Sequence, residues 1–206
     1  MELRSVGARR AVNLVMSARH KVFVSYHHAN DQNYKEIFDH RFGNKFGILQ
    51  RGAVNMGDID AGLNTEAIRQ KIRDEYLHDC SVTVVLVGVD TWRRKYVDWE
   101  IGATLRHTVK NPRGGLVGIF LPSYQQAHRD TLRARKDGAV ASYDQYTIPP
   151  RLHDNVGREF ASLHLWSNDP EEVQGWIHDA YNRKSRIDPD NSRESFANNR
   201  SGTRWY

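Results

Sequence analysis

Residues 81–88 read Ser81-Val-Thr-Val-Val-Leu-Val-Gly88, a nearly continuous run of apolar and β-branched residues. A run of this kind suits a strand that is buried on both faces, as in a parallel sheet. A second run, Gly114-Gly-Leu-Val-Gly-Ile-Phe-Leu121, has the same character and ends at Pro122. The two runs therefore predict the central strands of a sheet that is covered on both sides.

The segments around these runs alternate between strand and helix patterns. Further strands are predicted at residues 21–26 and 160–166, and an edge strand at residues 53–60. Helices with one apolar face are predicted at residues 31–41 (capped by Asn30), 65–76, 97–109 and 170–181. Strands alternating with amphipathic helices favour an α/β fold with a mainly parallel five-stranded sheet and helices on both faces. Residues 123–150 are predicted to form an irregular surface excursion.

The length of 206 residues suits one well-buried domain and is short for two. We assign this domain to residues 20–184, preceded by an N-terminal extension at residues 1–19. Beyond Lys184 the composition turns to Arg, Asn, Ser and Asp. Residues 185–206 are therefore predicted to form a polar, flexible tail.

The composition argues against nucleic acids and membranes as binding partners. The formal net charge is +5, but the basic residues are spread along the chain, and neither a zinc-finger spacing nor an RNP-like aromatic strand occurs. We therefore expect no nucleic-acid partner. No apolar run approaches the roughly 18–20 residues that span a bilayer, and residues 1–20 lack the apolar core and cleavage site of a signal peptide. The expected location is cytoplasmic, without a membrane.

Ligands of parallel α/β sheets bind in the crevice beyond the carboxyl ends of the strands. This rule selects the loops after Tyr26, around residues 57–64 and after Gly88. The chain carries neither GxGxxG after the first strand nor GxxxxGK[ST], and the first strand ends without the paired acids of a receiver domain. Adjacent residues of an extended segment point in opposite directions, so His27 and His28 are not expected to share a metal ion. No metal site is predicted.

The loop after Gly88 leads into Val97-Asp-Trp-Glu-Ile101. On a helical wheel, Val97 and Ile101 lie on the buried face, Glu100 lies at the edge of that face, and Trp99 points away from it. Two readings of Glu100 remain open from the residues alone. Its carboxylate either lines the crevice or is a first-turn acid that favours the helix dipole.

Three blocks of the sequence together resemble the bacterial TIR-like (flavodoxin-like) family and are similar to the TIR-like subunits of Thoeris antiphage defence systems. The blocks are Lys21-Val-Phe-Val-Ser-Tyr-His27, residues 81–88, and Thr91 with Val97-Asp-Trp-Glu-Ile101. The resemblance runs from about residue 20 to residue 120 and, more loosely, to Tyr181.

The resemblance implies an activity. In enzymatically active TIR domains, a glutamate in the helix after the third strand acts on the ribose next to nicotinamide, and Glu100 takes that position. The implied substrate is NAD⁺, with no further cofactor, and the implied product is a cyclic ADP-ribose isomer that activates a separate effector protein. Candidate substrate-binding residues are Ser25, Tyr26, His27, Asp58, Asp60, Thr91 and Trp92. Core packing of Tyr26 and Trp92, and a turn-forming role for the two aspartates, are the structural alternatives.

The sequence also departs from standard TIR domains. It lacks the long proline-bearing loop after the second strand, and it carries the excursion at residues 123–150. Because such loops shape substrate choice and self-association, the product and any self-association stay open. Two functions of another class stay open as well: a non-catalytic interaction module, with Trp99 on an assembly surface, and a nucleotide sensor without turnover.

Overall fold

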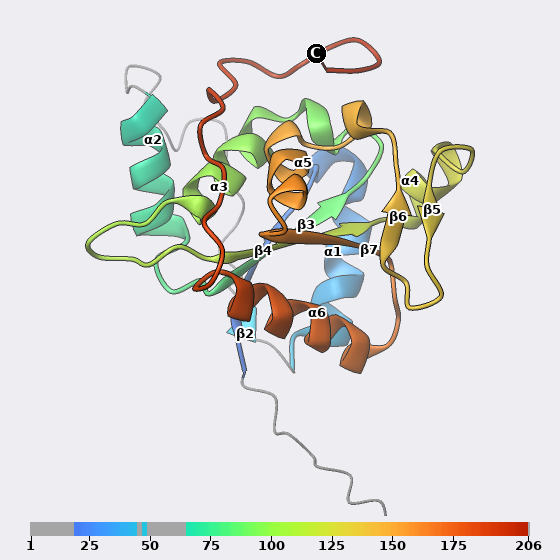
Figure 1. The fold of residues 1–206 in the computed structure, drawn as a ribbon, viewed down its shortest axis with the longest axis horizontal. Coiled ribbons are helices and arrows are strands. Elements are labelled where there is room, and N and C mark those ends of the chain that lie inside the picture. The colour runs from blue at the N-terminus through green and yellow to red at the C-terminus, as the bar shows by residue number, and fades with distance from the viewer. Residues whose placement is uncertain (1–18, 45–46, 49–64, 206) are drawn as a thin grey trace, which may run out of the picture.

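A parallel sheet of order β2-β1-β3-β4-β7 forms the centre of the computed structural model, which describes residues 19–44, 47–48 and 65–205 (Figure 1). Its longer strands are β1 (Lys21–Ser25), β3 (Val82–Val87), β4 (Gly115–Phe120) and β7 (Ala161–Leu165). The two-residue strand β2 (Gly47–Ile48) pairs with β1 at one edge. All pairs in this sheet are parallel, so the predicted α/β fold with a mainly parallel sheet is confirmed. The edge strand expected at residues 53–60 lies outside the described residues.

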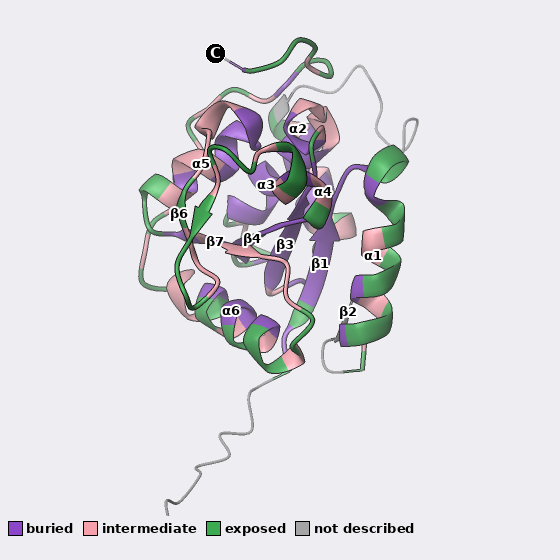
Figure 2. Cartoon of the chain, turned by 90° about the vertical axis from the view of Figure 1, so that its right-hand side faces the viewer, coloured by how far each residue is buried: buried purple, intermediate pink, exposed green. Residues whose placement is uncertain are grey.

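Helices cover both faces of the sheet, as the views in Figures 1 and 2 show. Helices α1 (His28–Phe42) and α6 (Pro170–Arg183) pack on the face that carries Val24, Val84 and Val117. The opposite face carries α3 (Lys95–Leu105) and α5 (Pro150–Gly157), and α2 (Thr65–Lys71) packs against α3. A π-helical turn, η1 (Ile72–Tyr76), continues α2. Every residue of β3 and β4 is buried, because both faces are covered.

The helix boundaries differ from the predicted ones for identifiable reasons. Helix α1 begins at His28, directly after β1, and its N-cap is His27. Asn30 does not cap this helix, because it lies inside the first turn; its side-chain amide donates to Asp90 Oδ2 at 2.9 Å. Helix α3 ends at Leu105, since the backbone of Arg106 is extended and its guanidinium pairs with Glu66, which belongs to α2.

The segment at residues 123–150 is more regular than predicted. Helix α4 (Pro122–Ala127) opens it, strands β5 (Arg133–Ala134) and β6 (Val140–Ser142) form an antiparallel pair, and a 3₁₀ turn, η3 (Gln145–Thr147), leads to α5. Tyr124 ties this segment to the sheet: it is fully buried, stacks on Phe120 and shares a hydrogen bond of 2.6 Å with Thr147. Helix α5 was not predicted.

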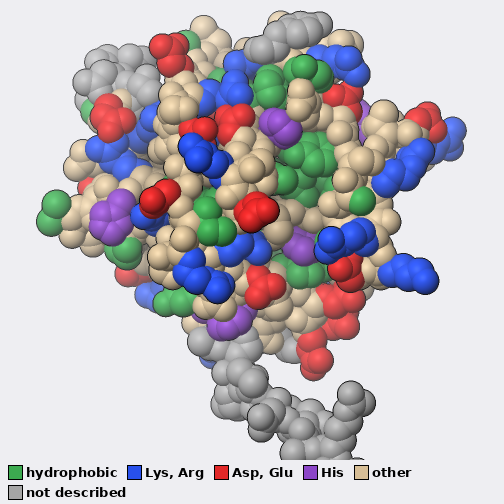
Figure 3. Space-filling model, in the orientation of Figure 1, with side chains coloured by type: hydrophobic (Ala, Val, Ile, Leu, Met, Phe, Trp, Pro, Cys, Tyr) green, Lys and Arg blue, Asp and Glu red, His purple; other side chains and the backbone are tan. Residues whose placement is uncertain are grey.

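The polar composition of residues 185–206 predicts a flexible tail, yet in the structure residues 185–205 run along α3 and α5 and are held there at several points, although many of them are exposed (Figure 1). Two large apolar side chains account for the difference. Phe196 and Trp205 are each only 6% exposed, and they anchor a chain that is otherwise polar. On the face shown in Figure 3, basic and acidic side chains are interspersed. Among the described residues, no helix is both long and apolar enough to cross a membrane.

Candidate functional site

The strand order places the candidate site at the carboxyl ends of β1 and β3. From β1 the sheet grows outward to β2, whereas from β3 it grows in the other direction to β4 and β7. The crevice of an open α/β sheet lies where the strand order reverses in this way. The chain leaves β1 after Ser25 and leaves β3 after Val87, so the residues that follow both strands gather at this edge.

Ser25 and Glu100 meet at this edge. Ser25 is the last residue of β1, and its hydroxyl donates a 2.6 Å hydrogen bond to Glu100 Oε2 of α3. This length is typical of a hydroxyl bound to a charged carboxylate. The alternation of side chains along β1 places Ser25 on the same face as Phe23, toward α3. The structure therefore brings two of the predicted site residues into contact, and their roles in binding and catalysis stay predictions.

Glu100 lies deeper than the helical wheel predicts. The wheel places it at the edge of the buried face, but the residue has no exposed surface. Helix α3 packs between the sheet and its neighbouring helices α2 and α5, and the Glu100 carboxylate contacts Ser25 of β1. The carboxylate is therefore held inside the protein in this conformation.

Tyr26 is placed apart from Ser25. Its ring packs with Val22 and Val24, on the face of the sheet that α1 and α6 cover, and it stacks on His28 with a ring separation of 4.3 Å. Its hydroxyl donates to Gln32 Oε1 at 2.6 Å. Burial, assisted by nearby acids, raises the pKa of Tyr26 to about 12. The structure thus favours the core-packing alternative for Tyr26.

His27 is buried at the start of α1. Its carbonyl oxygen accepts hydrogen bonds from the backbone amides of Asn30 and Asp31, and within the described residues its Nδ1 atom has no hydrogen-bond partner. Burial, and then the positive charge of Arg94, lower the pKa of His27 below its usual value. The imidazole is therefore neutral at pH 7 and can accept or donate one hydrogen bond without carrying charge.

Thr91 and Trp92 lie in the 3₁₀ turn η2 (Thr91–Arg93), which follows β3. The Thr91 hydroxyl accepts from the Gly88 amide at 2.8 Å and lies 3.4 Å from Asp31 Oδ2. Trp92 is buried, with the guanidinium of Arg93 5.1 Å from the centre of its ring. Both residues lie at the predicted edge of the sheet, but these contacts organise the turn itself. They support the structural alternative for Trp92.

Asp31 is a buried acid that the sequence places only at the start of the helix predicted at residues 31–41. It is 2% exposed, and its carboxylate lies so close to Gly88 that a Cβ atom there would be 2.2 Å from Asp31 Oδ2. Burial is the main cause that raises the pKa of Asp31 to about 6, and the Thr91 hydrogen bond opposes it. One sequence signal pointed to this position: Asp31 follows β1 closely, at the same edge of the sheet as Gly88.

Two predicted site residues, Asp58 and Asp60, lie outside the described residues and stay predictions. In the part of the chain that the structure describes, no group of three or more histidine, cysteine, aspartate or glutamate side chains could hold a metal ion.

Trp99 does not point into solvent, so the wheel prediction for this residue is wrong. It is 8% exposed, and its indole nitrogen donates to the carbonyl oxygen of Phe196 at 2.8 Å. Next to it, Asp98 forms an ion pair of 3.1 Å with Arg151 of α5, and both side chains are almost fully buried. The outer side of α3 is therefore occupied by the chain's own C-terminal residues.

Comparison with known proteins gives the family. The family model described as "Thoeris protein ThsB, TIR-like domain" matches residues 23–126, which is just over half of the chain and includes both Ser25 and Glu100. No curated protein matches the chain. By the extent of the family match, the chain belongs to the Thoeris ThsB TIR-like domain family.

Proposed function

We propose that this protein is an NAD⁺-consuming enzyme of antiphage defence. It cleaves the bond between nicotinamide and ribose and converts the remainder into a cyclic ADP-ribose-type signal, which activates a separate effector protein. The observation that supports this proposal most directly is the Ser25–Glu100 hydrogen bond at the carboxyl edge of β1, in a chain that belongs to the ThsB TIR-like family.

The proposed chemistry needs one well-placed carboxylate. As the glycosidic bond breaks, nicotinamide leaves with the bonding electron pair and positive charge develops on the ribose, which becomes oxocarbenium-like. The Glu100 carboxylate accepts hydrogen bonds from ribose hydroxyls and stabilises that charge. Nicotinamide is a neutral leaving group, so no general acid is required. An internal nucleophile of the same molecule then attacks the ribose and closes the ring, provided that water is excluded.

In this proposal the Ser25 hydroxyl occupies the place that a ribose hydroxyl takes in the complex. Glu100 has no exposed surface, so substrate binding requires a conformational change that uncovers it. A resting enzyme with this arrangement has low activity, which spares the NAD⁺ pool of the cell. We therefore expect full turnover only after a signal of infection.

The test is mass spectrometry of NAD⁺ incubated with the wild-type protein and with Glu100→Gln, in buffer and in lysates of phage-challenged cells. The wild type is expected to release nicotinamide and a linear or cyclic ADP-ribose species, and Glu100→Gln to release neither. Ser167 and Glu172 provide a matched control. Their hydrogen bond is also 2.6 Å but lies on the surface, so Glu172→Gln is expected to retain wild-type turnover. Intact NAD⁺ in every sample, including challenged cells, overturns the proposal.

The non-catalytic interaction module is the alternative. It drew its support from an outward-facing Trp99, and that side chain is covered by residues of the same chain. Intact NAD⁺ in every wild-type sample would favour this alternative, whereas a Glu100→Gln variant that consumes NAD⁺ as fast as the wild type would show that turnover does not depend on the Glu100 carboxylate.

A further inference from the structure

Helix α3 carries Glu100 but has no N-terminal cap of its own. Its N-cap residue is Arg94, whose side chain makes no capping hydrogen bond. Helices leave their first amide groups without partners inside the helix, and Asn, Asp or Ser at the N-cap normally satisfies one of them. Here the Lys95 amide donates instead to Asn199 Oδ1 at 3.1 Å, across 104 residues of sequence. The cap is supplied by the C-terminal segment, defined here as residues 190–205.

The C-terminal segment also forms hydrogen bonds with residues before and after Lys95. The Phe196 amide donates to Asp98 Oδ2 at 3.1 Å, and the Phe196 carbonyl accepts from the Trp99 indole. The Arg200 amide donates to the Arg93 carbonyl at 2.8 Å. The first turn of α3 and the preceding turn η2 are thus bound from outside by a short stretch of extended chain.

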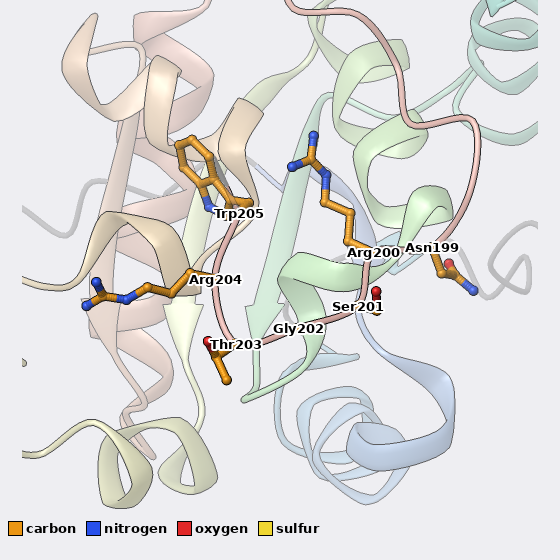
Figure 4. A pocket seen from close by; sticks show the side chains of 7 residues that line it. All are labelled: Asn199, Arg200, Ser201, Gly202, Thr203, Arg204 and Trp205. Atoms are coloured by element: carbon orange, nitrogen blue, oxygen red, sulfur yellow. The ribbon is translucent and has the colours of Figure 1, made fainter.

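Buried arginines hold the segment further along. Arg151 of α5 and Arg69 of α2 both donate to the Arg193 carbonyl, at 2.8 and 2.9 Å. At the other end, the Trp205 indole donates to the Ile148 carbonyl at 2.8 Å. Figure 4 shows Asn199 and Trp205 at opposite ends of the loop that lines a hollow of the surface. The cap therefore belongs to a segment that is fixed at both ends.

The C-terminal segment contacts the side of α3 that faces away from Ser25. At about 100° per residue, Lys95, Asp98 and Trp99 lie roughly 100–160° around the helix from Glu100. The segment therefore supports the helix from behind the carboxylate.

We propose that the C-terminal segment is a positioning element of the candidate active site, in which Asn199 caps α3 and so fixes the helix backbone that carries Glu100. This inference rests on the proposed function for its catalytic consequence. A helix that loses its cap frays at the first turn, and a displacement of about 1 Å in a catalytic group lowers turnover by up to two orders of magnitude.

The test compares Asn199→Leu with Asn199→Asp in the full chain. Aspartate keeps a side-chain oxygen that can accept from the Lys95 amide, whereas leucine has no acceptor. Under conditions in which the wild type consumes NAD⁺, Asn199→Leu is expected to lower kcat about tenfold with KM within about twofold, because Glu100 acts on the transition state. Asn199→Asp is expected to keep kcat within about twofold of the wild type. The control is Ser201→Leu, an exposed position in the same loop, which should leave kcat unchanged.

Hydrogen exchange of the amides at residues 95–99 provides a readout that does not depend on activity. Faster exchange in Asn199→Leu, restored in Asn199→Asp, supports the capping contact. Unchanged exchange overturns that contact, whatever the activity. Unchanged kcat overturns the catalytic role, and a higher kcat replaces it with an inhibitory one. Failure of the wild type to consume NAD⁺ overturns the proposed function, while the exchange experiment still decides whether Asn199 caps α3.

Discussion

At the scale of single residues, a buried carboxylate depends on the donors around it. The Ser25 hydroxyl supplies one such donor to Glu100 inside the protein, where water cannot replace it. Removing one partner of a buried hydrogen bond lowers the free energy of unfolding by more than the bond itself contributes. The remaining polar group stays buried without a partner and keeps its desolvation penalty. The Ser25–Glu100 pair therefore bears on stability as well as on the proposed chemistry.

We predict that Ser25→Ala destabilises the protein by about 1–3 kcal/mol. The measurement is the midpoint of urea unfolding. Ser167→Ala removes the equivalent hydroxyl from the surface pair with Glu172, and its cost is expected to stay within about 0.5 kcal/mol. Equal effects of the two substitutions would show that burial adds nothing at Ser25.

Asp31 gives a prediction about pH. Its pKa rises from 3.8 to about 6 on folding, so between these values the folded state binds more protons than the unfolded state. The contribution of Asp31 to stability is then present below pH 3.8 and is lost as the pH rises through 6. Asp31→Asn removes the charge, and it should raise the melting temperature at about pH 8 by more than it does at about pH 4. A difference that is independent of pH contradicts the raised pKa.

At the scale of elements, the approach of β4 to α6 depends on a residue without a side chain. A Cβ atom at Gly115 would lie 2.4 Å from the carbonyl oxygen of Ala180. This oxygen belongs to the backbone of a packed helix, so it cannot move away without shifting the helix. Gly175 lies on the exposed side of the same helix, where an added Cβ atom would have no neighbour within 4 Å among the described residues.

We predict opposite effects for the same substitution at these two glycines. Gly115→Ala should cost about 1–3 kcal/mol by overpacking, and Gly175→Ala should stabilise by up to about 1 kcal/mol through helix propensity. The measurement is the melting temperature of each variant relative to the wild type. If Gly115→Ala leaves the melting temperature unchanged, β4 and α6 can move apart without losing packing.

The elements that sequence predicts best are those with a strong local pattern. The apolar runs of β3 and β4 and the start of α6 at Pro170 agree with the structure. Helix α5 was not predicted because it has only eight residues, half of them polar, and because the buried Arg151 in its first turn depends on distant partners, Asp98 and the Arg193 carbonyl. Local patterns do not reveal such pairs.

The residues of the candidate site likewise differ in how far a local sequence pattern predicts them. Ser25 and Glu100 could be placed at one edge of the sheet because Ser25 ends a recognisable strand and Glu100 lies in the helix after another, and the family resemblance suggested the role of Glu100. The contacts of Asp31 with Thr91 and of Asn199 with Lys95 bridge 60 and 104 residues, and they arise only once the sheet and helices have assembled. Phe196 and Trp205 stand alone in a polar stretch, without a periodic pattern that marks them as buried.

At the scale of the whole molecule, the C-terminal segment joins α2, α3 and α5 into one unit. Arg69, Asp98 and Arg151, all buried, bind residues 193–196 of that segment. Without it, Arg69, Asp98 and Arg151 would each lose a hydrogen-bond partner at a buried position, although Asp98 and Arg151 would keep their ion pair with each other, and a buried charge that loses a hydrogen bond destabilises the fold.

We predict that a chain ending at residue 189 is less stable by several kcal/mol, since burying each of Phe196 and Trp205 contributes about 1.5–3 kcal/mol. Urea unfolding measures the midpoint and also the slope, which should fall because less surface is exposed on unfolding. A truncated chain that unfolds at the wild-type urea concentration would show that the segment contributes nothing to stability.

The capping of α3 by Asn199 also sets an order of events during synthesis. A ribosome that has already made Glu100 must add about a hundred further residues before the cap of that helix exists. Contacts between such distant residues form late in folding, because a long loop must close first. A nascent or prematurely terminated chain therefore holds the acid without the finished helix, and the proposed attack on the cell's NAD⁺ pool would be withheld until translation has passed Asn199.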